Sequence, residues 1–345
     1  MNKFFNPLEV MGAATDSLAM RLGVNVSNPH PIADALTLQD IAYAAGATSK
    51  SNMRAAGASD VQVMALGLAT GDFSKPLAEA AAQLIVRTYQ NQLQHGSFCS
   101  EVLVRNFQPA TIPAIDADVA LEPLADGAEI SHSAAVVAAG SSSARLTTFA
   151  KIIGITRQAL VNDDLEGFAR LAVDLGASGA RLEARLVAEA LEANLLLDDG
   201  LTAFDLVGDA HNNVVALALS DANLGVAMGK LRTQLSASGM RLDLAAKHLV
   251  VSAEQEFLAR SILADFGLDI SVHVLSYLPV GRWFVLADKT IHPIIGTLRL
   301  NKDPSPFRAV VQNRRPDKYD GAAVCVIADL GAVLVSRTGI VRGGV

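Results

Sequence analysis

The sequence is poor in aromatic residues and contains no long uninterrupted run of apolar residues. Aromatic residues are 5% of the 345 residues, whereas hydrophobic residues together are 51%, and Ala and Leu dominate this apolar set. Such a composition favours helices that pack through small side chains over an aromatic-rich binding protein. No apolar run approaches the ~18 residues of a membrane-spanning helix, so we expect no contact with a membrane.

Cysteine is also scarce, and the beginning of the chain does not look like a targeting segment. The two cysteines, Cys99 and Cys325, fit neither a disulfide framework nor a metal cluster. We expect both to be reduced and structural, which indicates synthesis in the cytoplasm. The first twenty residues have one early Lys and are interrupted by Asn, Pro, Glu and Asp, unlike a signal peptide.

Motifs of catalysis and of phosphate binding are missing as well. The stretch GASGA around Ser178 lacks the spacing of a nucleophile elbow and lies within a helical pattern. GDFSKP resembles a phosphate loop only superficially. Asp209 and His211 have no further ligand at a metal-binding spacing, and His248 and His273 lie in apolar strands, as satisfied core histidines do. We therefore expect no catalytic residue, no metal site and no cofactor.

The most informative feature that is present is a long helical pattern after a short β-favouring run. Asp163 is placed as its N-cap, with Glu166 three residues later as the partner in a capping box. Steps of three and four residues then put one set of side chains on a single face: Leu165, Phe168, Ala172, Leu175, Gly179, Leu182, Leu186 and Ala190. Such a helix would be roughly 45 Å long. Gly176 and Gly179 inside it indicate a bend or a close backbone approach.

Several segments resemble one known family in the same order along the chain. TRQALVNDDLEGFARL, which leads into the long helix, is similar to the segment before the spine helix of Mu-like (gpT-type) phage major head subunits. TGDFSKPLAEAAAQLIVRTYQ resembles the first helix of that family's capsid part, and LADGAEISH resembles its extended loop. FDLVGDAHNN is similar to the stretch after the spine, although Leu206 and Val207 replace polar positions of the family.

The resemblance covers about residues 35 to 340. It implies an α+β protein with the HK97-like major capsid fold, which has an N-terminal arm, an extended β-hairpin called the E-loop, a long spine helix in a peripheral domain and an α/β axial domain. The corresponding division of the chain is 1–70 for an arm or linker, 71–115 for the first helix and strand of the peripheral region, 116–145 for the E-loop, 146–194 for the peripheral domain with the spine, 195–295 for the axial domain, and 296–345 for strands that return to the peripheral domain.

The same resemblance implies a function in assembly. A major capsid protein of a tailed phage or prophage assembles with itself, as hexamers and pentamers, into an icosahedral shell around double-stranded DNA. Its implied partners are a portal, a head-maturation protease or scaffold and decoration proteins, and it is implied to assemble in the host cytoplasm and to end in the virion. The net charge of −7 argues against a dedicated nucleic-acid binder but is compatible with loose, non-specific contact with packaged DNA.

Two oppositely charged segments predict where subunits contact each other. The predicted hairpin between the β-favouring runs 102–107 and 146–155 is acidic, with Asp116, Asp118, Glu122, Asp126 and Glu129. It contains no Lys from Asp116 to Ala150, so we expect no Lys–Asn crosslink from it. A later basic stretch is interpreted either as a solvated loop or as the surface that receives a neighbour's hairpin, and its members are Arg299, Lys302, Arg308, Arg314, Arg315 and Lys318.

Two other functions stay open at this point. An encapsulin-like compartment or a gene-transfer particle would have the same fold and a different content. A hydrolase is the second alternative, because the family's upstream neighbour can be a protease, but no nucleophile–base pair supports it.

Overall fold

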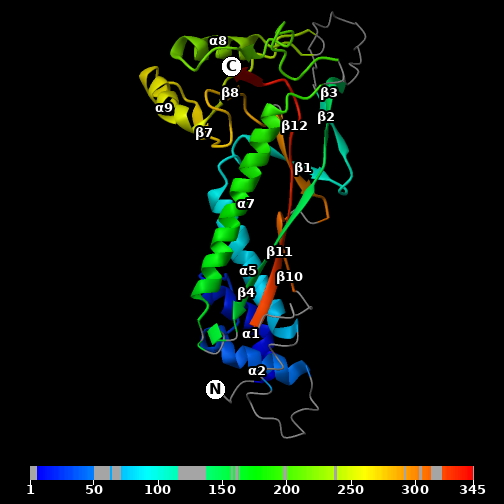
Figure 1. Ribbon diagram of the computed structural model, residues 1–345, viewed down its shortest axis with the longest axis vertical. Coiled ribbons are helices and arrows are strands. Elements are labelled where there is room, and N and C mark those ends of the chain that lie inside the picture. Colours follow the sequence, from blue (N-terminus) through cyan, green and yellow to red (C-terminus); the bar gives the residue numbers. More distant parts are fainter. Residues whose placement is uncertain are drawn as a thin grey trace, which may run out of the picture. The chain divides into compact units, whose positions relative to one another are not determined.

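The chain passes between two structural units, each assembled from three separate segments (Figure 1). The computed structural model describes residues 6–49, 63, 71–115, 137–156, 158–159, 162, 164–196, 200–236, 239–290, 293–302, 305–311 and 321–344. Unit 1 comprises Met1–Gln92, Thr148–Arg181 and Ser305–Asp329, and unit 2 comprises Leu93–Thr147, Leu182–Pro304 and Leu330–Val345. These two units differ from the six-part division expected from the sequence. That finer division stays a prediction.

Unit 1 begins with helices that pack on one another. α1 (Pro7–Arg21) starts at Pro7 after Asn6, whose side chain accepts a hydrogen bond from the backbone N–H of Leu8 at 3.1 Å. η1 (Ala33–Ala35) and α2 (Leu38–Ser49) follow, and α1 contacts α2 and α5 (Gly71–Gln92). The buried face of α1 includes Val10, Ala13, Ala14 and Leu18. Residues 7–49 therefore bury an apolar face within their own chain, whereas the sequence predicted an arm that needs a partner surface.

Two helical details of unit 1 differ from the expectation. The helix predicted at Leu38–Ala45 is present as α2, but the one predicted at Val61–Leu68 lies outside the described residues except for Val63. Pro76 was expected in the first turn of its helix, yet α5 starts at Gly71 and holds Pro76 in its interior. A proline there lacks the N–H of one helical hydrogen bond, a loss that the packing of α5 on α1 and α2 offsets.

The sheet of unit 1 has three strands in the order β10-β11-β4. β10 (Phe307–Val311) and β11 (Gly321–Leu330) are antiparallel, and β4 (Thr147–Thr156) confirms the strand predicted before the long helix. α5 packs on β10, where the rings of Tyr89 and Phe307 meet edge to face at 5.0 Å between centroids. This contact joins α5, in the first chain segment of unit 1, to β10, in the last segment of the same unit.

Unit 2 is built around a five-stranded sheet in the order β5-β13-β8-β6-β7. Its strands are β5 (Val214–Val215), β13 (Ile340–Gly343), β8 (Trp283–Leu286), β6 (His248–Val251) and β7 (Ser271–Val274). Only β8 runs against the other four. α8 (Asp221–Thr233) contacts β13 and β5, while η2 (Ala253–Gln255) and α9 (Glu256–Asp265) lie beside β6 and β7. The alternation predicted for 195–290 is therefore present, and β13 completes its sheet from the chain's end.

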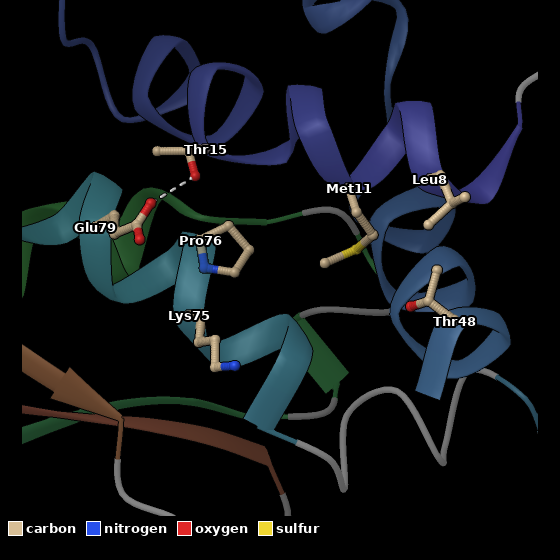
Figure 2. Close-up of a pocket in the computed structure, with 7 residues that line it drawn as sticks. All are labelled: Leu8, Met11, Thr15, Thr48, Lys75, Pro76 and Glu79. Carbon is tan, nitrogen blue, oxygen red and sulfur yellow. Dashed lines mark hydrogen bonds between the residues drawn. The ribbon is translucent and has the colours of Figure 1, made fainter. Parts of the chain in front are cut away.

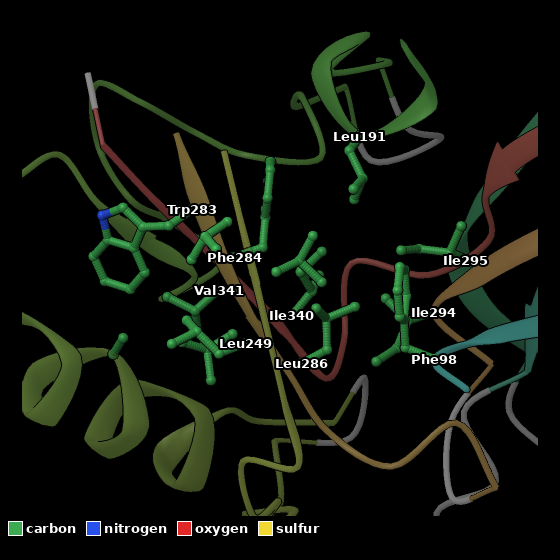
Figure 3. Close-up of a cluster of buried hydrophobic side chains, with 14 of the residues drawn as sticks. Phe98, Leu191, Leu249, Trp283, Phe284, Leu286, Ile294, Ile295, Ile340 and Val341 are labelled. Atoms are coloured by element: carbon green, nitrogen blue, oxygen red, sulfur yellow. The ribbon is translucent and has the colours of Figure 1, made fainter. Parts of the chain in front are cut away.

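The core of unit 2 lies between this sheet, α8, α9 and the second half of the long helix. Figure 3 shows Phe98, Leu191, Leu249, Trp283 and Ile340 gathered in it, and all five are essentially inaccessible to solvent. Four-residue strands buried along their whole length, such as β6 and β8, explain the continuous apolar runs HLVV and WFVL in the sequence. This core gives unit 2 a rigid frame on which surface loops can be held.

Unit 2 also contains a smaller sheet and a hairpin stem. β1 (Cys99–Val104), β9 (Ile295–Leu300) and β12 (Ala332–Leu334) form the sheet in the order β1-β9-β12. β2 (Ala110–Ile115) and β3 (Val137–Ala144) pair antiparallel, from Ala110 opposite Ala144 to Ile115 opposite Val137. This pair is the stem of the hairpin predicted from the sequence; residues 116–136 lie outside the described residues.

The predicted long helix is α7 (Glu166–Glu192), which continues from unit 1 into unit 2. Its expected N-cap, Asp163, lies outside the described residues, and the side chain of Asp164 accepts from the backbone N–H of Glu166 at 2.9 Å. The predicted face is buried at Leu165, Phe168 and Ala172 but is one residue out of register later, where Glu183, Val187 and Leu191 are buried in place of Leu182, Leu186 and Ala190. A 3.5-residue pattern drifts by ~20° per heptad around a straight 3.6-residue helix, which accounts for the slip.

Two further local expectations need correction. The spacing of Ser252 and Gln255 predicts a second capping box, for a helix that ends at Asp265. In the structure Ser252 does not cap α9 through its side chain; its hydroxyl instead lies 3.4 Å from Oε1 of Gln255, with a 3-10 turn between. The run 322–336 was expected to form strands paired with each other. Its strands β11 and β12 belong to two different sheets and separate at Gly331, whose added Cβ would lie 3.0 Å from the carbonyl oxygen of Arg145.

Candidate functional site

The charged segments proposed from the sequence are described only in part. Asp116, Asp118, Glu122, Asp126 and Glu129 lie outside the described residues, as do Arg314, Arg315 and Lys318. Lys302 is exposed in unit 2, and Arg308 belongs to unit 1, where it pairs with Asp329. The basic stretch is therefore not a single surface of one unit.

Arg299 is a clear correction to that proposed surface. Its side chain is buried, with 4% of the residue exposed, and its Nη1 donates to Oε1 of Glu183 at 2.6 Å. Nε2 of His95 donates to the other carboxylate oxygen of Glu183 at 3.1 Å. Glu183 itself is fully buried in α7. An arginine committed to a buried carboxylate in its own unit is not available to a neighbour's acidic hairpin.

The electrostatics of this buried cluster favour a charged carboxylate. Burial alone would raise the pKa of Glu183, but hydrogen bonds from His95 and Arg299 and the positive charge of Arg299 lower it to about 2. Burial, and then the charge of Glu183, raise the pKa of the nearby Cys99 thiol far above its usual range. Cys99 is therefore a neutral, unreactive thiol at physiological pH, as its predicted structural role requires.

A second buried ion cluster anchors the end of α7. The carboxylate of Glu192 lies 2.9 Å from Nε of Arg282 and 3.3 Å from Nη2 of Arg342. Arg282 also donates to the carbonyl oxygen of Gly344 at 2.8 Å, and the Arg342 guanidinium lies 5.5 Å from the centre of the Phe204 ring. Burial and the charge of Arg282 lower the pKa of Arg342, and Glu192 opposes this. The cluster ties α7 to β8 and β13, the middle strands of the large sheet.

The two core histidines satisfy each other. Nδ1 of His248 and Nε2 of His273 are 3.1 Å apart on the neighbouring strands β6 and β7, and the ring of Phe98 packs against both. Burial lowers the pKa of His248 and lowers that of His273 to about 4, where the charges of His248 and Arg260 add to the effect. This geometry confirms the prediction of a satisfied core residue for His248; His273 is also hydrogen-bonded but is only partly buried.

Asp209 and His211 belong to a self-bonded loop. The Asp209 carboxylate accepts from the backbone N–H groups of Asn213 and Val214, at 2.8 and 3.0 Å, and pairs with Lys230. His211 lies 3.4 Å from Nη1 of Arg337. Across the described part of the chain, no three His, Cys, Asp or Glu side chains gather as metal ligands would.

The glycines of α7 mark close approaches in unit 1. A Cβ added at Gly176 would lie 2.7 Å from the carbonyl oxygen of Ile85 and 2.9 Å from Cβ of Thr88, in α5. At Gly179 the added atom would lie 2.2 Å from the ring of Phe307. The close approach predicted for both positions is therefore present, and the bend stays a prediction.

One groove of unit 1 has the volume of a ligand pocket without its chemistry. It measures about 440 Å³ and lies between α1, α2 and α5, as Figure 2 shows. The lining residues are Leu8, Met11, Thr15, Thr48, Lys75, Pro76 and Glu79. Its one carboxylate, Glu79, accepts a hydrogen bond from Thr15 at 2.9 Å. The lining brings together no set of metal ligands, and the Thr15–Glu79 pair has no histidine beside it.

Neither ion cluster of α7 was predicted from the sequence. A signal for Glu183 was available, because continuing the buried face of α7 from Ala172 in steps of four, four and three residues reaches it. A carboxylate on such a face requires a buried cation, and Arg299 in the run IIGTLRL is one. No comparable pattern links Glu192 with Arg282 and Arg342, whose pairing follows only from the sheet order.

In the part of the chain that is described, no helix is both long and apolar enough to span a membrane.

Comparison with known proteins identifies the family. The phage capsid protein family matches residues 139–343, which is more than half of the chain. The chain therefore belongs to the phage capsid protein family, and its role is to form the protein shell of a particle. No curated protein sequence matches it.

Several solved structures are similar in outline. A virus-like particle from Pyrococcus furiosus has a TM-score of 0.48 at 10% identity, covering 76% of this chain and 97% of that one. The SrpI encapsulin from Synechococcus elongatus PCC 7942 has 0.47 at 8%, covering 74% and 86%. The head of Helicobacter pylori bacteriophage KHP40 has 0.45 at 12%, covering 72% and 87%. The family assignment does not depend on these distant similarities.

Proposed function

We propose that this chain is the major head subunit of a Mu-like (gpT-type) phage or prophage. Many copies, arranged as pentamers and hexamers, assemble in the host cytoplasm into an icosahedral shell with the HK97-like architecture. The observation that carries this proposal is the match of residues 139–343 to the phage capsid protein family. The long helix α7 and the antiparallel β2–β3 stem are compatible with the spine helix and the E-loop of that architecture.

The proposed mechanism depends on contacts between subunits, with no catalytic step. Two ion clusters hold α7 to strands of unit 2 and to the loops beside them, so that unit 2 can act as a rigid building block. The acidic hairpin, residues 116–145, reaches a neighbouring subunit, partly through the basic stretch without Arg299. A portal, a head-maturation protease or scaffold and decoration proteins are the further partners of such a subunit.

What the particle encloses distinguishes a phage head from an encapsulin-like compartment or a gene-transfer particle. We propose loose, non-specific contact with packaged double-stranded DNA, in keeping with the net charge of −7. Particles purified from cells that carry the complete gene cluster should hold DNA that resists nuclease until the shell is opened. Protein cargo in place of nucleic acid would favour an encapsulin-like compartment, and short random host DNA would favour a gene-transfer particle.

A further inference from the structure

The histidines of β6 and β7 present two ring nitrogens to one point in unit 2. Nδ1 of His248 and Nε2 of His273 are 3.1 Å apart. The strand register places His273 opposite Val250, two residues after His248, so both side chains lie on the same face of the sheet. The separation of the nitrogens fits a shared cation, because two nitrogens that bind one Zn²⁺ at about 2.0–2.1 Å are about 2.9–3.4 Å apart.

A hydroxyl group from the loop before β1 reaches the same point. Oγ of Ser97 lies 3.4 Å from Nε2 of His273. The loop is held by its own backbone, since the N–H groups of Phe98 and Cys99 donate to the carbonyl oxygen of His95 at 3.2 and 3.0 Å. Ser97 is exposed and His273 is only partly buried, so an ion can reach the ring nitrogens from the solvent.

The His273 ring already has the orientation of a metal ligand. A hydrogen bond with the backbone of Gln94 favours the protonated ring and raises its pKa, so the ring donates to the carbonyl oxygen of Gln94. Because Nε2 faces His248 and Ser97, the donating nitrogen is Nδ1, and Nε2 carries a lone pair. Metal-ligating histidines almost always donate their other ring N–H to a carbonyl or carboxylate oxygen in this way.

The charges around the pair are compensated. Lys247 and Arg260 each pair with a carboxylate, at 3.2 and 2.9 Å. Lys289 donates to the backbone carbonyl oxygens of the loop that carries Ser97. Asp288 adds a negative charge whose attraction favours a positive charge at His248. Burial keeps both rings neutral at physiological pH, and neutral imidazole is the form that binds a metal.

We propose that Nδ1 of His248, Nε2 of His273 and Oγ of Ser97 bind one divalent cation of the Zn²⁺ class, with the remaining coordination position open to water. Imidazole ligands suit Zn²⁺, Cu²⁺ and Ni²⁺ rather than Mg²⁺ or Ca²⁺. Binding moves the proton of His248 from Nδ1 to Nε2, so neither ring changes its net charge. The inference goes beyond the proposed function and does not depend on it.

The bound ion joins three separate parts of unit 2. β7 is an edge strand, and its neighbour in the sheet is β6 alone. A cation held by both strands and by the loop before β1 ties this edge to the rest of the unit, and it stabilises the folded chain over the unfolded one. The sequence predicted no metal site, because its three ligands lie far apart along the chain and one of them is a serine.

Binding of Zn²⁺ alone tests the site in the full chain, prepared without a polyhistidine tag. Isothermal titration with ZnCl₂ at pH 7.5 should show one ion per chain, and His248→Gln and His273→Gln should each weaken binding at least tenfold. Ser97→Ala should weaken it two- to fivefold. His211→Gln is the matched control, because His211 is a partly buried histidine of the same unit, and it should bind as the wild type does. No saturable binding by the wild type, or equal binding by His273→Gln, would overturn the proposal.

Two further measurements separate ligation from a structural effect of the substitutions. With Cu²⁺ as the probe, electron paramagnetic resonance should show two coordinating nitrogens in the wild type and in His211→Gln, and fewer in His273→Gln. ZnCl₂ should raise the urea midpoint of the wild type, EDTA should reverse the rise, and His273→Gln should show none. If His248→Gln does not fold by circular dichroism, His273→Gln decides. A midpoint that ZnCl₂ leaves unchanged or lowers in the wild type would contradict the site.

Discussion

At the residue scale, the glycines of α7 show why small residues are needed where two elements approach closely. Gly176 and Gly179 face α5 and β10 within unit 1, and neither position has space for a Cβ. Gly167, in the same helix, has no heavy atom within 4 Å of an added Cβ. A side chain would therefore collide with its neighbours at Gly176 but not at Gly167, nine residues earlier.

Gly176→Ala should lower the free energy of unfolding of the chain by about 1–3 kcal/mol, because the new methyl group collides with the backbone of α5. Gly167→Ala should leave it unchanged or raise it by less than about 1 kcal/mol, because alanine favours the helix and meets nothing. Urea titration followed by circular dichroism checks the pair. Equal effects of the two substitutions would contradict the close approach.

Glu183 is the buried residue on which the packing of α7 in unit 2 depends most. Glu183→Gln should destabilise the chain by about 3–5 kcal/mol, because it removes the buried carboxylate that accepts from the Arg299 guanidinium and leaves the more distant and exposed Glu101, at 3.9 Å, as the carboxylate that pairs with it. Glu189→Gln is the matched control in the same helix, since Glu189 is exposed and pairs with the exposed Arg185 one turn away. It should change stability by less than about 0.5 kcal/mol. A mild effect at Glu183 in the same urea titration would show that Glu101 can take the place of Glu183 as the partner of Arg299.

At the scale of elements, the contact between β6 and β7 should be sensitive to pH. His273 has a folded-state pKa of about 4 against 6.5 for an ordinary histidine, because burial and nearby positive charge disfavour its protonation. Between pH 4 and pH 6.5 this histidine is therefore protonated in the unfolded chain but not in the folded chain. The contribution of His273 to the free energy of unfolding is fully present above pH 6.5 and is lost as the pH falls toward 4.

This pH dependence is measured as the urea midpoint of the full chain from pH 8 to pH 4. The slope between pH 6.5 and 4 should be smaller in His273→Gln, which keeps a polar side chain but does not titrate. Below about 4.5 a further loss should appear in both proteins, as Glu183, with a pKa of about 2, begins to take up its proton preferentially in the unfolded chain. An identical slope for both proteins above pH 4.5 would rule out His273 as the cause.

The hairpin is the second element with a testable contact. Reversing Asp126 and Glu129 to Lys should impair assembly, and reversing Arg314 and Arg315 to Glu in the same chain should restore part of it. Exposed charges are screened over ~8 Å at physiological salt, so part of this contact should weaken as salt rises. Sedimentation at low and high salt measures the yield of particles. A chain with both reversals that assembles no better than either alone would contradict charge docking.

Elements with a strong local pattern could be predicted from the sequence, whereas their partners could not. The helix expected after Asp163 and the strand expected at Lys247–Ser252 lie within about two residues of the observed α7 and β6, because a long amphipathic pattern and a short apolar run are local signals. The strands of the run 322–336 were placed correctly but paired wrongly, since pairing depends on distant segments. Arg299 was misread for the same reason: its charge is visible in the sequence, but its burial beside Glu183 is not.

At the scale of the whole molecule, the proposed function lies in the contacts among copies of the chain. The described polar clusters are bonded within their units, whereas large apolar side chains of unit 2 such as Val207 and Phe257 are exposed. A subunit of this kind satisfies its charges internally and leaves apolar surface for its neighbours. Assembly then adds burial that the isolated chain cannot achieve, so folded stability and assembly should rise together with protein concentration.

The most direct test is electron microscopy of the purified full-length chain, with sedimentation of the same sample. The account predicts closed shells of megadalton mass, or pentamers and hexamers on the way to them, with little stable monomer. A monodisperse species of 36.1 kDa that persists at high concentration and forms no particle would contradict it.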